Sequence, residues 1–156
     1  MSHIHEKIDF TADAFIVHKN KVLLRIHDKY HVWLQIGGHI ELNEDPIEAL
    51  FREIEEECGL KTELVGDRGE IFDERNKRLP VPRFLHRHKI KQGEVHEHIN
   101  CIYVLKALTT EIKPRENEVP TEFKWFTSEE LSNPQYEILP HVQFYAKEAI
   151  KIAAQD

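Results

Sequence analysis

The stretch GGHIELNEDPIEALFREIEEECGL, which spans residues 37–60, is the part of this chain that most restricts its fold. Its second half carries three glutamates, Glu53, Glu56 and Glu57, spaced three, four and one residues apart. Residues three or four positions apart are neighbours on the surface of a helix. Glycines stand at both ends of the stretch and permit tight backbone turns. The pattern therefore predicts a loop, a helix and a stop that hold carboxylates in one place.

The predicted helix has distinct start and stop signals. Asp45 suits the N-cap, Pro46 the first helical position and Glu48 the third, which together make a capping-box pattern. Gly59 stands where a left-handed residue commonly ends a helix. At about 100° per residue, the three glutamates fall on an arc beside an apolar stripe, so the helix can pack on a sheet and present carboxylates to a cleft. The stripe consists of Ile47, Leu50, Phe51, Ile54 and Cys58.

Composition restricts the class of protein. The 156 residues suit one ordinary domain, and we expect a single domain over residues 1–156. Hydrophobic residues make up 40% and charged residues 31%, as in globular proteins. A formal charge of -7 argues against nucleic acid as a partner, because nucleic-acid surfaces usually carry a basic stripe. No apolar run is long enough for a membrane span, and the N-terminus lacks the apolar core of a signal peptide. We therefore expect a cytoplasmic protein with no membrane contact.

The remaining segments predict an α/β fold with a mixed sheet. Residues 9–18 and 21–27 are expected to form a hairpin around Lys19 and Asn20. Residues 61–79 give only fragments of strands, and 73–82 are interpreted as an exposed loop. Further strands are expected at 83–91, 97–108 and 122–126, a short helix from Ser128, and a terminal helix from about 137 to 154.

Residues 38–60 can be written as the pattern G-x5-E-x7-R-E-U-x-E-E-x-G-U, where U is aliphatic. This pattern resembles the signature of the Nudix hydrolase family, whose MutT-like members cleave nucleoside diphosphates linked to another group. A chance match is on the order of one in a billion per starting position. The resemblance implies a Nudix α/β/α sandwich with a mixed β-sheet. The matching residues are Gly38, Glu44, Arg52, Glu53, Ile54, Glu56, Glu57, Gly59 and Leu60.

The chemistry of this pattern also follows from the residue types. Hydrolysis of a diphosphate requires negative oxygens to be neutralised and a water to be activated, and Mg²⁺ can do both through oxygen ligands. Like charges at helical spacing destabilise a helix, so they make most sense around a cation. The resemblance implies that Glu53, Glu56 and Glu57 bind Mg²⁺, or Mn²⁺ as a substitute, and that Glu53 is the candidate base. Arg52 is expected to orient Glu53.

Ligands from outside the helix are also expected. The resemblance implies a metal-bound backbone carbonyl, here from Gly37 or Gly38. Members of the family often add a carboxylate from elsewhere in the chain. We assign Glu97 to this role, with Glu94 and Glu118 as rivals and an ordinary surface role as the alternative for each.

Some acidic residues in the stretch are expected to have structural or solvated roles. Glu44 precedes the helix, and we expect it to brace the loop through a salt bridge or backbone N–H groups. Gly59 shapes the end of the helix. A run such as EIEEE can also be a solvated face, and Glu55 is expected to be no more than that.

Two His-x-His pairs lie on the predicted strands after the helix, His86 with His88 and His96 with His98. Alternation along a strand places both imidazoles of a pair on one face. Such pairs suit zinc, contacts to a substrate phosphate or base, or a solvated surface, and the sequence leaves these three open. We name His86, His88 and Arg83 as candidate substrate-binding residues.

The sequence favours a Mg²⁺-dependent hydrolase that cleaves a nucleotide or related diphosphate by water attack at phosphorus. The rival hypothesis is a Nudix-like module that senses a nucleotide without cleaving it, although such modules tend to lose the glutamates or arginine that this chain keeps. Isomerisation of an isoprenoid diphosphate would need a catalytic cysteine, and neither Cys58 nor Cys101 is suitably placed. The expected partner is a small molecule, and the sequence leaves its identity and a homodimer open.

Overall fold

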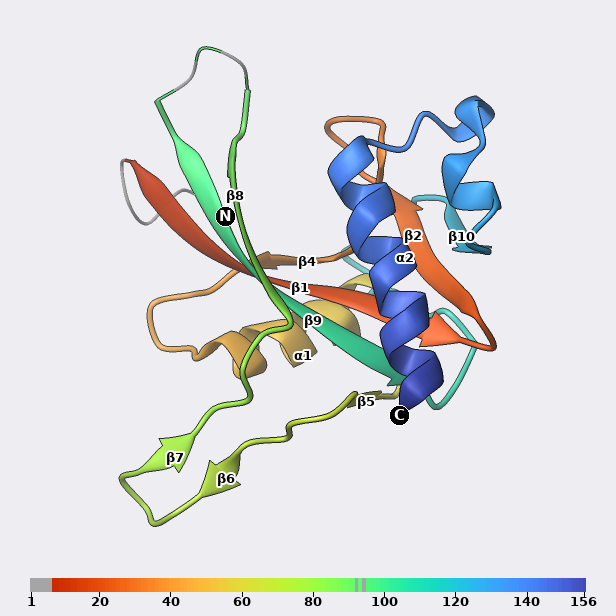
Figure 1. The fold of residues 1–156 in the computed structure, drawn as a ribbon. Coiled ribbons are helices and arrows are strands. Elements are labelled where there is room, and N and C mark those ends of the chain that lie inside the picture. Colours follow the sequence, from red (N-terminus) through yellow and green to blue (C-terminus); the bar gives the residue numbers. More distant parts are fainter. Residues whose placement is uncertain (1–6, 92, 94) are drawn as a thin grey trace.

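The computed structural model describes residues 7–91, 93 and 95–156. Its strands and helices follow one another in the order shown in Figure 1. They are β1 (Ile8–His18), β2 (Lys21–Ile26), β3 (Trp33–Leu34), β4 (Ile36–His39), α1 (Pro46–Glu57), β5 (Thr62–Leu64), β6 (Glu70–Ile71), β7 (Lys77–Arg78), β8 (Phe84–Lys89), β9 (Glu97–Ala107), β10 (Phe123–Phe126), two 3₁₀ turns (Glu130–Ser132 and Pro134–Tyr136) and α2 (Pro140–Gln155).

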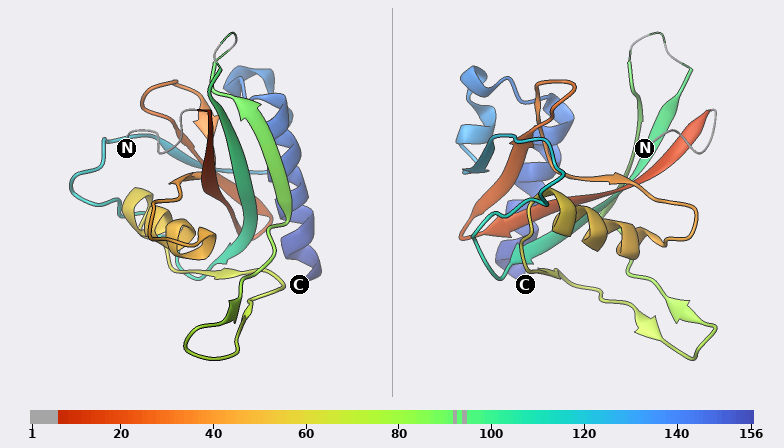
Figure 2. Two further views of the ribbon diagram at one scale, coloured as in Figure 1. Left: turned by 90° about the vertical axis from the view of Figure 1, so that its left-hand side faces the viewer. Right: turned by 180° about the vertical axis from the view of Figure 1, so that it is seen from behind.

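The main sheet is mixed and is built around β1. This strand pairs in parallel with β9 and antiparallel with both β2 and β4. The path through the sheet is β10-β2-β1-β9-β5, with β3, β4 and β8 attached beside it. Helix α1 covers one face and α2 the other, which Figure 2 shows edge-on. The predicted α/β/α arrangement with a mixed sheet is therefore confirmed.

Alternation along β1 divides the core between the two helices. Phe15 and Val17 belong to a cluster of buried residues with Val142 and Ala146 of α2. Residues of the other parity, Ala12, Ala14 and Ile16, belong to a second cluster that includes Leu50 and Ile54 of α1. Successive side chains of a strand point to opposite faces, so one strand supplies both layers.

Helix α1 begins and ends as its local sequence predicts. The Asp45 carboxylate accepts from the backbone N–H groups of Ile47 (2.8 Å) and Glu48 (2.9 Å), and the Glu48 carboxylate accepts from Asp45 N (2.8 Å). This is the predicted capping box. Gly59 has φ +63°, and its N–H donates to the Ile54 carbonyl at 2.9 Å. These short-range contacts define where the helix begins and ends.

The predicted apolar stripe was wrong at one position. Phe51 is 37% exposed, whereas Glu57 is only 7% exposed. Seven residues make nearly two full helical turns, so Glu57 lies on the same face of α1 as the buried Leu50. The buried face of α1 therefore carries a carboxylate at its C-terminal end.

Two other segments differ from expectation. Part of the predicted exposed loop forms β7, which pairs with β6 as a short hairpin that projects from the main sheet (Figure 1). Helix α2 begins at Pro140 and not near 137, because Glu137 adopts a left-handed conformation (φ 51°) that a helix cannot contain.

Within the described ranges, no helix has the length and apolarity that a membrane crossing requires.

Truncating two adjacent residues of α1 tests this orientation. We expect Leu50→Ala to lower the free energy of unfolding by about 2–5 kcal/mol, because Leu50 is fully buried between α1 and the sheet. We expect Phe51→Ala to cost about 1 kcal/mol or less. Urea denaturation measures both, and an equal or larger loss for Phe51→Ala would contradict the described packing.

Candidate active site

Arg52 gathers the acidic groups of the motif around one guanidinium. Its Nε and Nη2 donate to the two carboxylate oxygens of Glu44 at 2.5 and 2.9 Å. Its Nη1 donates to Glu53 at 2.7 Å and to Glu56 at 3.2 Å. The Nη2 group also donates to the His39 carbonyl at 3.0 Å. Two oxygens of one carboxylate bound by one guanidinium form a fixed geometry, so Glu44 holds Arg52 and Arg52 orients Glu53.

Glu44 also ties the loop before α1. Its Oε2 accepts from Glu41 N at 3.1 Å, so the carboxylate closes the loop onto its own backbone. The hydrogen bond from Arg52 holds the pKa of Glu44 below its usual value. Glu44 thus lies at a structural position, with its oxygens already occupied by Arg52 and the loop.

Glu57 is held by a cation that sequence reasoning did not predict. One of its oxygens accepts from Arg25 of β2, and the other accepts from Gly37 N at 3.1 Å. Burial raises the pKa of Glu57 to about 8, and the Arg25 charge opposes that rise. The sequence carries one signal for this ion pair, which is that Arg25 stands within the apolar run of β2. A charge in a buried segment is rarer, and therefore more informative, than a charge on the surface.

Glu53 lies directly against the glycine loop. A Cβ at Gly38 would meet the Glu53 carboxyl carbon at 2.6 Å, closer than nonbonded atoms approach, so any other residue there would displace the Glu53 carboxylate. Burial raises the pKa of Glu53, and the negative charges of Glu56 and Glu118 raise it further. Arg52 opposes these effects. Negative charge is therefore concentrated between the glycines and α1.

The structure does not bring Glu97 to these carboxylates. Glu97 pairs with Ile8 along β1, whereas Gly37 pairs with Asp13, five residues further along the same strand. Five residues of strand span roughly 16 Å. The partly buried Glu97 carboxylate instead accepts from Arg87. Of the rivals, Glu118 is the one whose charge acts on Glu53, while Glu94 lies outside the described residues.

The donor set fits the metal that the sequence implies. Glu53, Glu56 and Glu57 offer hard carboxylate oxygens, the ligands that Mg²⁺ and Mn²⁺ prefer. Arg115 Nη1 donates to Glu56 at 3.0 Å, so the loop after β9 also reaches this acidic group. Arg25, Arg52 and Arg115 bind these three glutamates, but Arg52 also binds Glu44, so three cations face four carboxylates. A divalent cation at this position would offset the remaining repulsion.

A cavity of about 470 Å³ lies on the α2 face of the sheet and reaches the glycines. Glu53 and Glu57 contact Gly38 and Gly37 from the α1 side. Neither glycine has a side chain, so backbone alone separates the cavity from these carboxylates there. The walls combine apolar, aromatic and polar groups. They include Thr11, Asp13, Arg25, Tyr30, Val32, Leu34, Gln35, Asn100, Ile102 and Tyr145.

Three buried polar groups in the cavity wall are relevant to binding. Among the residues that the structure describes, Arg25 Nε and Gln35 Oε1 have no hydrogen-bond partner. Gln35 Nε2 donates to the Asp13 carboxylate at 3.1 Å, which orients the amide. Burial raises the pKa of Asp13 to about 6. Arg25 and Gln35 both line the cavity beside the glycine loop, while these two atoms themselves are covered by protein.

The predicted histidine pair on β8 reaches the cavity, and Arg83 does not. His86 and His88 both line it, together with His141 of α2. The His86 ring stacks on His141 with centroids 5.0 Å apart, and burial lowers the pKa of both. Arg83 instead donates to the Val65 carbonyl at 3.4 Å, outside the cavity wall. Neutral imidazoles, which can accept as well as donate, thus form one end of the cavity.

Comparisons with known proteins agree on one family. A family model of the NUDIX domain matches residues 9–147. A protein of Lactococcus lactis subsp. cremoris (strain MG1363) named "Probable DHNTP pyrophosphohydrolase" is 26% identical over 129 residues, which cover 78% of this chain and 72% of that protein. The crystal structure of a NUDIX-family hydrolase from Clostridium perfringens is 32% identical, covers 93% of this chain and 97% of that chain, and superposes with a TM-score of 0.78. A MutT NUDIX hydrolase from Burkholderia pseudomallei, 21% identical over 94% of this chain and 98% of that chain, shares the fold with a TM-score of 0.62.

A double-mutant cycle tests the ion pair between Arg25 and Glu57. We expect Arg25→Met to lower the free energy of unfolding by about 3–5 kcal/mol, because it leaves a buried carboxylate without its cation. Glu57→Gln should be destabilising as well, since it leaves Arg25 buried without its anion. The double variant should lose less than the sum of the two, by about 0.5–3 kcal/mol. Additive losses in urea denaturation would show that the two side chains do not interact.

Proposed function

We propose that this chain, which belongs to the Nudix family of pyrophosphohydrolases, is a Mg²⁺-dependent enzyme that cleaves the diphosphate linkage of a nucleoside diphosphate joined to another group. The observation that carries the proposal is the placement of Glu53 and Glu57 directly behind Gly37 and Gly38, at the end of a cavity large enough for a nucleotide-sized ligand. A diphosphate that lies along the glycine loop would meet the carboxylate cluster at its scissile bond.

In this proposal the carboxylates of α1 hold the metal and position the water. Glu53, Glu56 and Glu57 would bind Mg²⁺, which when bound neutralises phosphate oxygens and lowers the pKa of a water. Arg52 fixes Glu53 through its 2.7 Å hydrogen bond, so that this carboxylate can accept the proton of a water that attacks phosphorus. Glu118 replaces Glu97 as the proposed outside carboxylate, because its charge acts on Glu53.

The cavity would hold the remainder of the substrate. Arg25 lines the cavity beside the glycines, and its positive charge would attract a phosphate group. Tyr30 and Tyr145 provide aromatic walls against which a heterocycle would pack. His86 and His88 remain our candidates for contacts to a phosphate or base at the far end. A heterocycle joined to a di- or triphosphate would match these walls.

A substrate panel with Mg²⁺ tests the proposal and separates it from a non-catalytic sensor. The panel contains nucleoside triphosphates, nucleoside diphosphate sugars and DHNTP, the compound named for the Lactococcus lactis relative. We expect turnover of at least one compound with Mg²⁺ or Mn²⁺ and none with a chelator. Release of phosphate or of pyrophosphate identifies the bond that is attacked. Nucleotide binding without turnover of any compound would contradict hydrolysis and favour a sensor.

Replacing single carboxylates of α1 tests the assigned residues. We expect Glu53→Gln to lower kcat by on the order of 10²–10⁴, because it removes a metal ligand and the proposed base while keeping the shape of the side chain. The matched control is Glu55→Gln in the same helix, where the Glu55 side chain is 71% exposed and should leave kcat unchanged. Glu57→Gln is less decisive, since it also leaves Arg25 unpaired. Full activity of Glu53→Gln would refute the assignment.

A further inference from the structure

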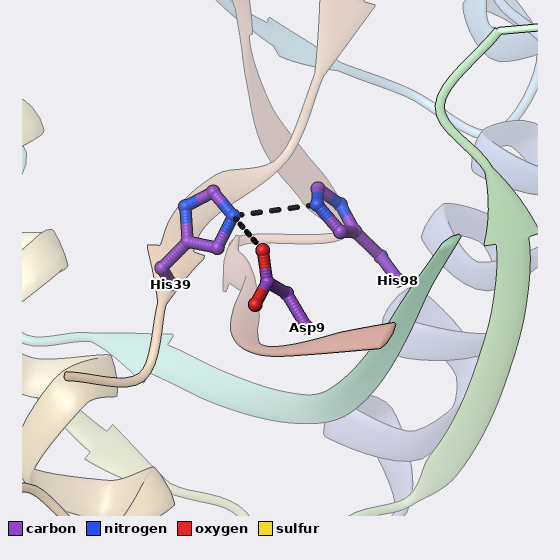
Figure 3. Close-up of side chains that lie close together, drawn as sticks. All are labelled: Asp9, His39 and His98. Atoms are coloured by element: carbon purple, nitrogen blue, oxygen red, sulfur yellow. Dashed lines mark hydrogen bonds and ion pairs between the residues drawn. The ribbon is translucent and has the colours of Figure 1, made fainter. Parts of the chain in front are cut away.

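A second group of metal-ligating side chains lies apart from the glutamates of α1. Asp9 of β1, His39 of β4 and His98 of β9 converge on one point, as Figure 3 shows. His39 Nε2 lies 3.3 Å from His98 Nε2 and 3.6 Å from Asp9 Oδ2, and the three ligand atoms all lie within 4.8 Å of one another. Three strands thus contribute one side chain each.

The pairing of the sheet brings these side chains together. Asp9 and His98 are direct partners in the parallel pair β1–β9. Strand β4 pairs with the other edge of β1, where His39 is the partner of Thr11. Thr11 lies two residues after Asp9 along β1. Partners in register, and residues two apart along a strand, point to the same face. The backbone therefore directs all three ligand groups to one side of the sheet.

The separations suit a metal with imidazole and carboxylate ligands. In a tetrahedral zinc site the ligand atoms lie about 2.0–2.1 Å from the metal, which places them about 3.3 Å from one another. The two separations from His39 Nε2, 3.3 Å to His98 Nε2 and 3.6 Å to Asp9 Oδ2, are close to this value. Two Nε2 atoms that face each other and one carboxylate oxygen are also the donor types that zinc binds.

We propose that Asp9, His39 and His98 form a Zn²⁺ site that is distinct from the carboxylate site of α1. The Asp9 carboxylate is almost fully buried, at 1% exposure, and a buried anion needs compensating positive charge or hydrogen bonds. His96 Nε2 donates to Asp9 Oδ2 at 2.9 Å, so His96 is a positioning residue that orients this ligand.

The site would act on the substrate cavity. His39 and His98 both line that cavity, so a metal held by three protein ligands would keep its open coordination position toward it. There it would add a fixed positive charge that can bind an anionic group of a ligand. The Mg²⁺ site shares none of these ligands, and it differs in donor chemistry because Mg²⁺ selects oxygen over imidazole nitrogen. The His39 carbonyl accepts from Arg52, which links the two sites.

Metal titration of the untagged chain tests this site without any assay of activity. After removal of metals with a chelator, Zn²⁺ binding is measured by calorimetry, and Co²⁺ serves as a visible-absorption probe of the coordination geometry. We expect one equivalent of Zn²⁺ and an intense Co²⁺ spectrum. His98→Gln and Asp9→Asn should weaken Zn²⁺ binding by about 100-fold or more, and His96→Gln by about 10–100-fold. Should Asp9→Asn fail to fold, His98→Gln decides alone.

Two control variants should bind Zn²⁺ as the parent does. His31→Asn removes an exposed histidine, and asparagine tolerates its left-handed conformation (φ 53°). Glu53→Gln removes a carboxylate of the Mg²⁺ site only. The proposal is overturned if the parent chain binds less than one equivalent, if His98→Gln binds as tightly as the parent, or if either control loses binding to the same degree.

Discussion

The contacts of Arg52 join the parts of the chain on which the site depends. One guanidinium binds Glu44 in the loop, Glu53 and Glu56 on α1, and the backbone carbonyl of His39 on β4. Loop, helix and strand are thereby held at one point, with the acidic groups on the side that faces the glycines. A lysine could not replace it, because a single ammonium lacks the planar fork that binds several acceptors at fixed angles.

Burial of negative charge is the cost of this arrangement. Arg25 supplies a second cation to Glu57 from β2 of the sheet, yet burial still raises the pKa of Glu57 to about 8. Groups with strongly perturbed pKa values gather at functional sites more often than elsewhere. The capping box and the buried Leu50 and Ile54 stabilise α1 elsewhere along its length, which allows its C-terminal end to carry this charge.

Local signals predicted the helix and the family, while contacts between distant segments could not be foreseen. The capping residues and Gly59 act within a few positions, so their roles follow from spacing alone. Helical periodicity could not show which of two adjacent arcs faces the sheet, and Phe51 was therefore placed inside when it is exposed. The positions of Glu97 and of the proposed zinc ligands depend on the register of β1 against β9 and β4, which the sequence does not specify. Register placed Glu97 far from α1 and His98 beside Asp9.

We infer that the fold assembles a cation site from Glu53, Glu56 and Glu57 behind the glycine loop. Crystals of the chain soaked in Mn²⁺ test this site directly. Mn²⁺ gives a usable anomalous signal, whereas Mg²⁺ does not. We predict an anomalous peak bound by these three carboxylates and adjacent to Gly38. Mn²⁺ found only at other positions, with Glu53, Glu56 and Glu57 bound to no ion, would contradict this inference.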